Sequence, residues 1–478
     1  MKNLFLLSIA CLFSTFILAD GGYSIKIKLE NYTQQQLFLG YYYGEKPYSK
    51  DTATVDEKGF FAFEGATELP GGIYIVIMSP SNTYFQILVN PGEQHFTITT
   101  DATAPIERAA IEGSPDNKLF FDYLNYLSAR RPEADTLRKQ IERLSDNPLE
   151  KEKRQTALTK INQEVEKYRN DIVAKYPKTL TAALIRSTME LKMPEFEGAE
   201  KDVQFKQWRY ALDHWFDNMD LTDPRLLYTP FLFGHIDQYI QKMNVQHPDS
   251  LSKALDIVLT KAKPAPETFK FYLIHYLNFF AKSELVGMDA VYVHLVEKYY
   301  ATGQAPWTEK EQLEKIIENG MGLKPTLIGK IAPNIELIKR DGSKMSLHEV
   351  DSEYTILYIW KFDCGHCKKS TPIIKEFYEK YKDKGVKIVA ICFQFNADVS
   401  PCWNYVDENG IQDWIHTVDP YNRSRYRDLY YIRSTPQIYI LDRKKEILSK
   451  RIGANQLEEV MDRIIEMKNK EKQDNSGK

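Results

Sequence analysis

The spacing of apolar residues changes twice along this 478-residue chain. Residues 23–100 alternate apolar and polar side chains in short runs, residues 115–310 repeat apolar side chains at helical spacing, and residues 326–468 mix the two patterns. A period of two favours strands, whereas a period near 3.6 favours helices. Because the chain is also too long for one ordinary core, we predict a multidomain protein with three domains of different class.

The first region, residues 20–105, is predicted to be a small antiparallel β-sandwich or barrel. Its runs, such as YSIKIKL and GIYIVIM, are separated by turn signals, including DEKG at 56–59 and NPG at 90–92. Short alternating runs at this spacing are typical of all-β domains. The region contains no cysteine and no gathering of acidic residues or histidines, so we interpret it as a binding or docking module.

Residues 115–310 are predicted to form an all-α domain. A stripe of apolar side chains recurs at helical spacing, and we interpret it as core packing. Its members are Phe205, Trp208, Leu212, Trp215, Phe216 and Met219. Residues 133–176 are heavily charged and carry a heptad-like pattern for just over two heptads, which favours a solvated helical hairpin. A dimerising arm is the alternative, so the oligomeric state is left open.

The helical pattern gives way around residues 303–325, where we predict a linker. Beyond it, in residues 326–468, the strand-like runs YTILYIW, VKIVAICF and STPQIYILD alternate with helical stretches. A last helix is expected from about Asn455, and the polar tail after it is expected to be frayed. Alternating strands and helices indicate an α/β domain.

Residues 1–19 have the pattern of a secretory signal peptide. One lysine precedes an apolar run from Leu4 to Leu18, and a small residue follows. An uncleaved membrane anchor and lipid attachment at Cys11 are the alternatives. We therefore expect an exported protein of the periplasm or cell envelope. Its net charge of −3 shows no basic excess, so nucleic acid is not an expected partner.

The motif CGHC at residues 364–367 carries the chemistry. A strand-like run leads to Cys364, and the residues from Lys368 onward favour a helix that begins at the pair. Free backbone N–H groups at a helix N-terminus stabilise a thiolate on Cys364. Cys367, one turn on, would lie close enough to resolve a mixed disulfide. This spacing predicts a redox-active pair.

Other uses of these cysteines are weaker. A structural zinc site usually needs two such pairs, and haem attachment needs a histidine where Lys368 stands. We therefore predict neither a metal nor a cofactor. Cys392 and Cys402 are interpreted as a buried strand residue and a helix-start residue that are not paired, with a second disulfide or a relay pair as the alternative. Six further histidines show no metal-binding spacing. They are His214, His235, His247, His275, His294 and His348.

Residues 328–468 resemble the exported TlpA/ResA-like thiol–disulfide oxidoreductases of the thioredoxin superfamily. Trp360 stands four residues before Cys364, and Pro372 stands eight residues after it, as in that family. Thr435-Pro436 matches the cis-proline segment that faces the dithiol. The resemblance implies a thioredoxin fold and protein thiols or disulfides as substrates. It also implies that Thr435 and Pro436 bind substrate backbone and that Trp360 shields one side of the site.

Three positions depart from the family or bear on the direction of electron flow. Tyr358 stands where thioredoxin carries a buried aspartate, so the proton acceptor for Cys367 is unidentified. Asp363 replaces a tryptophan, and its carboxylate opposes ionisation of Cys364. The Gly-His dipeptide of the motif resembles that of the protein disulfide isomerases, which implies that His366 stabilises the reduced thiolate and makes the disulfide more oxidising. Because Asp363 and His366 tune the potential in opposite directions, reductase and oxidase or isomerase activity remain open.

We therefore expect an exported thiol–disulfide oxidoreductase with a membrane or periplasmic electron donor or acceptor. A thiol peroxidase is one alternative, but it needs a threonine or serine where Lys361 stands. The other alternative is an envelope binding protein whose front domains do the work, with the thioredoxin-like domain as an accessory.

Overall fold

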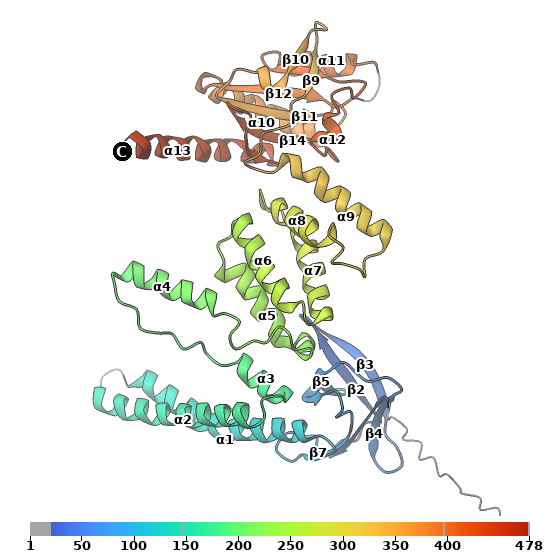
Figure 1. The fold of residues 1–478 in the computed structure, drawn as a ribbon, viewed down its shortest axis with the longest axis vertical. Helices are drawn as coiled ribbons and strands as arrows, with labels where there is room; N and C mark the ends of the chain where they lie inside the picture. Colours follow the sequence, from blue (N-terminus) through green and yellow to red (C-terminus); the bar gives the residue numbers. More distant parts are fainter. Residues whose placement is uncertain (1–20, 145–146, 395–396, 477–478) are drawn as a thin grey trace, which may run out of the picture. The chain divides into compact units, whose positions relative to one another are not determined.

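The computed structural model describes residues 21–144, 147–394 and 397–476 (Figure 1). The predicted signal peptide therefore lies outside the described residues. The chain divides into two compact units. One contains the residues up to 243 together with 261–268, and the other contains 244–260 and everything from 269 onward. Across the described ranges, we find no helix whose length and apolar character would let it span a bilayer.

The first unit begins with a β-sandwich, as the alternating pattern predicted. One sheet has the order β4-β1-β7-β8 and the other β3-β2-β5-β6. The strands are β1 (Tyr23–Glu30), β2 (Gln36–Tyr43), β3 (Lys46–Thr54), β4 (Phe60–Gly65), β5 (Gly72–Met78), β6 (Thr83–Val89), β7 (His95–Asp101) and β8 (Ala110–Glu112). The pairing is not wholly antiparallel, because β1 and β7 run parallel. Local alternation specifies a strand but not the direction of a distant partner.

Helices complete the first unit. They are α1 (Pro115–Arg143), α2 (Pro148–Lys175), α3 (Leu180–Ser187), α4 (Glu200–Asp213) and α5 (Pro230–Gln238). The predicted helical hairpin is formed by α1 and α2, whose buried contact consists of Ala134 and Leu137 on one helix and Leu158 and Ile161 on the other. Tyr123 of α1 and Ile172 of α2 form a second buried cluster with Ile185 of α3. The rest of α2 is mostly charged and exposed.

The predicted core role of the aromatic stripe is only partly correct. Phe216 and Met219 are buried, but Phe205 is 61% exposed and no residue of α4 is fully buried. Trp208 instead holds α4 through a hydrogen bond from its Nε1 to the backbone O of Met243 at 2.9 Å. Helical spacing predicts which residues share a face, but not whether a partner surface covers that face.

The second unit starts with helices that include a segment we had predicted to be a linker. They are α6 (Pro248–Ala262), α7 (Pro266–Ala281), α8 (Asp289–Leu295) and α9 (Lys310–Leu323). The prediction of a linker at 303–325 is therefore wrong over α9. Its glycines mark close packing rather than a helix end. A Cβ at Gly320 would come within 2.7 Å of Val296, and one at Gly322 within 2.3 Å of the Tyr431 ring.

A seven-stranded sheet of order β10-β9-β13-β12-β11-β14-β15 forms the α/β domain. The strands are β9 (Glu336–Lys339), β10 (Lys344–Ser346), β11 (Tyr354–Trp360), β12 (Val386–Cys392), β13 (Ile415–Val418), β14 (Gln437–Asp442) and β15 (Ile447–Lys450). The central strand β11 is buried along its whole length and pairs parallel with β12 and antiparallel with β14. A strand covered on both faces explains the uninterrupted apolar run YTILYIW.

Alternate side chains of β11 enter two cores. Ile356 and Tyr358 pack with α10 (Gly365–Tyr381), α11 (Ser400–Asn409) and α13 (Leu457–Ser476). Leu357 and Ile359 pack on the other face with the short helix α12 (Tyr426–Leu429) and the loops around β9 and β10. The last helix continues to Ser476, so the expectation of a frayed tail is wrong over its described part.

Candidate functional site

The CGHC motif lies where the central strand ends and a helix begins. After β11 ends at Trp360, Cys364 takes an extended conformation and forms the N-cap of α10. Its Sγ accepts a hydrogen bond from the backbone N–H of Cys367 at 3.4 Å. A sulfur thereby does what a serine or aspartate oxygen does at most helix starts. The predicted helix start at the pair is confirmed.

The two sulfurs have opposite environments. Cys364 is partly exposed, whereas Cys367 is completely buried, and neither is in a disulfide. Partial burial raises the pKa of Cys364, but hydrogen bonds from the Cys367 thiol and from the backbone N–H groups of Cys367 and His366 outweigh it, so the pKa falls below its ordinary value. Burial, followed by the hydrogen bond with Cys364, raises the pKa of Cys367 to about 12. One thiol of the pair is therefore poised to ionise first.

The segment Thr435-Pro436 lies against the reactive sulfur. Its peptide bond is cis, as the resemblance implied. In the thiol form, Sγ of Cys364 donates a hydrogen bond to the backbone O of Thr435 at 3.4 Å. The two segments are 71 residues apart in sequence and meet because β14, which follows Pro436, pairs with β11, which precedes Cys364. Binding of substrate backbone by Thr435 and Pro436 stays a prediction.

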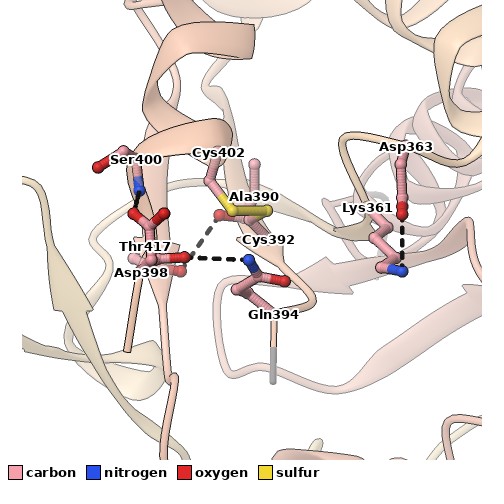
Figure 2. The surroundings of a disulfide bond; sticks show 9 residues. All are labelled: Lys361, Asp363, Ala390, Cys392, Gln394, Asp398, Ser400, Cys402 and Thr417. Atoms are coloured by element: carbon pink, nitrogen blue, oxygen red, sulfur yellow. Dashed lines mark hydrogen bonds and ion pairs between the residues drawn. A yellow bond between two sulfur atoms is a disulfide. The ribbon is translucent and has the colours of Figure 1, made fainter. Parts of the chain in front are cut away.

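The tuning residues predicted beside the pair are both on the surface. The carboxylate of Asp363 forms an ion pair with Lys361 at 2.9 Å, which Figure 2 shows. The imidazole of His366 is exposed, while its backbone N–H reaches the sulfur of Cys364. The Lys361 ammonium offsets part of the negative charge that Asp363 brings to the site.

Trp360 lies in the core beneath the site rather than on the surface around it. It is 1% exposed and packs against Tyr405, with ring centroids 4.9 Å apart. In register it is opposite Cys392 of the neighbouring strand. Its predicted role of shielding one side of the site stays a prediction.

Hydroxyl groups occupy the space where thioredoxin has its buried aspartate. Tyr358 Oη donates to the backbone O of Cys367 at 3.5 Å, and Thr371 Oγ1 donates to the same oxygen at 3.0 Å. Tyr405 Oη in turn donates to Thr371 Oγ1 at 3.1 Å. Burial raises the pKa of Tyr358 well above its ordinary value, so this phenol keeps its proton. The structure therefore supplies no carboxylate at position 358 to take the proton of Cys367.

Cys392 and Cys402 form a disulfide, which corrects our interpretation of both as unpaired. The bond joins the end of β12 to the first turn of α11 with an S–S distance of 2.06 Å (Figure 2). Both residues are buried, at 2% and 1% exposure. At the start of α11, the backbone N–H of Ser400 donates a hydrogen bond to Oδ1 of Asp398 at 3.0 Å. Two further cysteines in a sequence whose first residues predict export were the clue to this pairing.

The disulfide also bears on the zinc alternative. Its two sulfurs are bonded to each other and cannot serve as the third and fourth thiolate ligands. Within the described ranges, no three histidine, cysteine or acidic residues are grouped so as to hold a metal ion. Several of the histidines have protein partners instead, such as His235 with the O of Trp215 and His294 with Asp256.

Three family models match the chain. One described as Thioredoxin-like matches residues 351–447, and two domains of unknown function, DUF4369 and DUF5106, match residues 23–120 and 149–320. Curated relatives include the thiol-disulfide oxidoreductase ResA of Bacillus anthracis, 27% identical over 135 residues, which are 28% of this chain and 74% of that protein. ResA of Oceanobacillus iheyensis is 28% identical over 124 residues, or 25% of this chain and 62% of that protein.

Solved structures with similar folds include a domain of a possible thiol-disulfide isomerase from Cytophaga hutchinsonii. It is 29% identical, covers 30% of this chain and 97% of its own, and has a TM-score of 0.28. A thioredoxin-like protein from Bacteroides caccae is 16% identical and covers 57% of this chain and 99% of its own, with a TM-score of 0.43. The C-terminal region of the chain is a thioredoxin-like domain similar to the ResA thiol-disulfide oxidoreductases, and it follows two domains of unknown function.

Proposed function

We propose that the protein is an exported thiol–disulfide oxidoreductase whose CGHC pair exchanges electrons with cysteines of other proteins. The observation that carries this proposal is the contrast within the motif. Cys364 is partly exposed and has a lowered pKa, whereas Cys367 is buried and has a pKa raised to about 12. Such a contrast suits a nucleophile and a resolving thiol. The similarity to ResA supports the same assignment.

Reduction of a client disulfide then follows from these roles. The Cys364 thiolate attacks one sulfur of the client, forming a mixed disulfide and releasing the other client sulfur as a thiolate, which takes up a proton. Cys367 loses its proton and attacks Sγ of Cys364, releasing the second client thiol. Two electrons pass to the client, and the domain is left with a Cys364–Cys367 disulfide. Oxidation of a client dithiol is the reverse sequence.

The second half of this sequence is the slower one in our proposal. Because the pKa of Cys367 is about 12 and position 358 is a tyrosine, no ready carboxylate takes the proton before the attack. The departing client thiolate is the strongest base at hand, and it accepts that proton as it leaves. We therefore expect the mixed disulfide on Cys364 to be longer-lived than in a protein with a buried carboxylate at this place.

Export is part of the proposal, and the second disulfide of the domain supports it. A disulfide such as Cys392–Cys402 persists in oxidising compartments and is rare in the cytosol. In that setting the active-site pair needs a membrane or periplasmic electron donor or acceptor to complete its cycle. The reduction potential decides which of the two it is. A value near −270 mV matches thioredoxin and indicates a reductase, whereas one near −180 mV matches protein disulfide isomerase.

Insulin reduction by the mature protein tests the proposed function. We expect the wild type to accelerate reduction of insulin disulfides by dithiothreitol, Cys364→Ser to return the rate to the uncatalysed background, and Cys367→Ser to accumulate a covalent insulin adduct. Cys392→Ser/Cys402→Ser, which leaves the CGHC pair intact, is the matched control. Unchanged insulin reduction in Cys364→Ser would refute the assignment.

A further inference from the structure

A pocket of about 470 Å³ opens beside the cis-proline segment. One side of it belongs to the thioredoxin-like domain and includes Ser434, Pro436, Gln437, Arg451 and Ile452. The other side belongs to the helices of the same compact unit and includes Phe280, Tyr292, Asn319 and Leu323. Ser434 and Pro436 flank Thr435, whose backbone oxygen contacts the Sγ of Cys364. The pocket is thus adjacent to the place where a client cysteine must bind.

Specific contacts hold the helical side of the pocket against the domain. The Tyr431 ring lies directly over Gly322 of α9, where a side chain would collide with it, and Tyr431 Oη donates to Oδ1 of Asn319. Arg433 forms an ion pair with Glu318 of α9 at 2.8 Å. These contacts place α9 as a wall of the pocket, which the prediction of a linker in that region had missed.

A buried ion pair makes a second connection. Lys450 of β15 is only 2% exposed, and its ammonium pairs with the carboxylate of Asp289 at the start of α8. Removing one partner from such a pair leaves an uncompensated buried charge, so the two groups hold strand and helix together. A fragment limited to residues 326–478 would lose both Asp289 and α9, and with them this side of the pocket.

Among the cationic side chains at the pocket, one has no carboxylate partner in the described part of the chain. Arg433 is paired with Glu318, and Lys450 is paired with Asp289. Arg451 lines the pocket, is exposed, and has the side chain of Tyr439 as a hydrogen-bond partner, but it forms no ion pair with a carboxylate in the part of the chain that the structure describes. Its backbone N–H is anchored to the O of Ile438 at 2.8 Å, so the position of its stem is fixed. A guanidinium binds a carboxylate through two parallel hydrogen bonds.

We propose that this pocket is a client-recognition subsite that takes an acidic side chain close to the reactive cysteine of the client. Arg451 is the specificity-determining residue, and Phe280, Tyr292 and Ile452 contact the aliphatic part of the bound side chain. Specificity then comes from the thioredoxin-like domain and the helices α7 to α9 together. This inference rests on the proposed function and adds the class of client sequence to it.

Single-turnover kinetics with the full mature protein test the subsite. The probes are disulfide-linked peptide dimers that differ only in carrying glutamate, glutamine or lysine at one of the three positions on either side of the cysteine. We expect the pre-reduced wild type to reduce the best glutamate dimer about tenfold faster than its glutamine counterpart, since a charged hydrogen bond is worth about that factor. The lysine dimer should be slowest.

Variants separate Arg451 from general effects of charge. Arg451→Gln should bring the glutamate-to-glutamine ratio close to one, and Arg451→Lys should restore part of it. Arg443→Gln removes an exposed arginine that pairs with Asp351 outside the pocket, and it should keep the wild-type ratio. Equal rates for glutamate and glutamine dimers in the wild type, or an unchanged ratio in Arg451→Gln, would overturn the subsite while leaving the proposed function standing. Failure to reduce any dimer or insulin would overturn both.

Discussion

The chain carries two pairs of cysteines, each of which lies where a strand ends and a helix begins. The two pairs differ in their exposure and in whether the sulfurs are bonded. Cys364 follows β11 and caps α10, with Cys367 one turn inside the helix. Cys392 ends β12, the next strand of the sheet, and Cys402 lies in the first turn of α11. The first pair is a dithiol with one sulfur open to solvent, and the second is a disulfide buried on both sides.

The difference teaches that position relative to the helix N-terminus and the surface determines how each pair behaves. The N-cap sulfur of Cys364 receives backbone N–H groups and faces outward, where a thiolate is stabilised and a client can reach it. At 2% and 1% exposure, the sulfurs of Cys392 and Cys402 offer no approach to a protein client. The first pair has the exposure that the proposed exchange needs, and the second ties α11 to the sheet.

The largest expected effect lies within the first pair. At pH 8 a thiol with a pKa of about 12 is ionised in roughly one part in 10⁴, whereas Cys364 has a pKa below its ordinary value. Because a thiolate of higher pKa is also the stronger nucleophile, and because Cys367 is completely buried, we expect iodoacetamide to alkylate Cys364 at least about 10²-fold faster than Cys367 in the reduced protein. Mass mapping of peptides over time measures both rates. Comparable rates at the two sites would contradict the contrast on which the proposed function depends.

The next effect concerns the buried disulfide. Cys392→Ala/Cys402→Ala opens a loop with a sequence separation of 10, and the unfolded chain gains conformational freedom. We expect the free energy of unfolding of the thioredoxin-like domain to fall by about 3 kcal/mol. Urea unfolding followed by tryptophan fluorescence measures the change. Insulin reduction at 25 °C should persist, and its loss in a folded double variant would show that the second pair takes part in electron transfer.

A pH dependence of intermediate size follows from Cys367. Its folded pKa of about 12 lies above its unfolded value, so the unfolded state loses this proton first as the pH rises. The free energy of unfolding that this thiol contributes is fully present below the unfolded pKa of about 8.5. It falls by about 1.4 kcal/mol per pH unit as the pH rises from there toward the folded pKa. The lowered pKa of Cys364 acts in the opposite direction, and its contribution is already complete above the unfolded pKa.

Urea midpoints of the two redox forms measure this effect. Between pH 9 and pH 10.5 we expect the reduced protein to lose about 2 kcal/mol relative to the oxidised protein, which has neither thiol. The oxidised form is the control for lysines and tyrosines, which titrate in both forms over this range. Parallel pH profiles for the two forms would show that Cys367 is not held protonated by the fold.

Features with a local cause were predictable from the sequence. The strand β11 was visible as an apolar run, and the start of α10 at Cys364 followed from the residues after the motif. The cis bond before Pro436 followed from the family resemblance. Each of these depends on a few neighbouring residues or on one motif, which is why the CGHC site itself could be found before the structure.

Features that depend on distant contacts were not predictable in the same way. The glycines of α9 indicated a break, but Gly322 is small because the Tyr431 ring covers it. The Cys392–Cys402 bond depends on how the first turn of α11 lies against the end of β12. The parallel pairing of β1 with β7 depends on how the chain passes between two sheets. Each of these contacts joins separate segments of the chain, so the pattern of neighbouring residues does not indicate it.

The smallest effect tests how far surface charge tunes the first pair. From the sequence alone, the carboxylate of Asp363 was expected to oppose ionisation of Cys364. In the structure it pairs with Lys361 at 2.9 Å, and the two side chains are 51% and 32% exposed, so solvent and the ammonium both weaken its field. We therefore expect Asp363→Asn to lower the pKa of Cys364 by at most about 0.7 of a unit, because exposed charge pairs contribute no more than about 1 kcal/mol. The pH dependence of Cys364 alkylation measures the shift, with Asp398→Asn as a carboxylate control beside the buried disulfide. A fall of more than one pKa unit would mean that Asp363 acts on the thiolate unscreened, and the reduction potential would then depend on this residue as much as on the helix N-terminus.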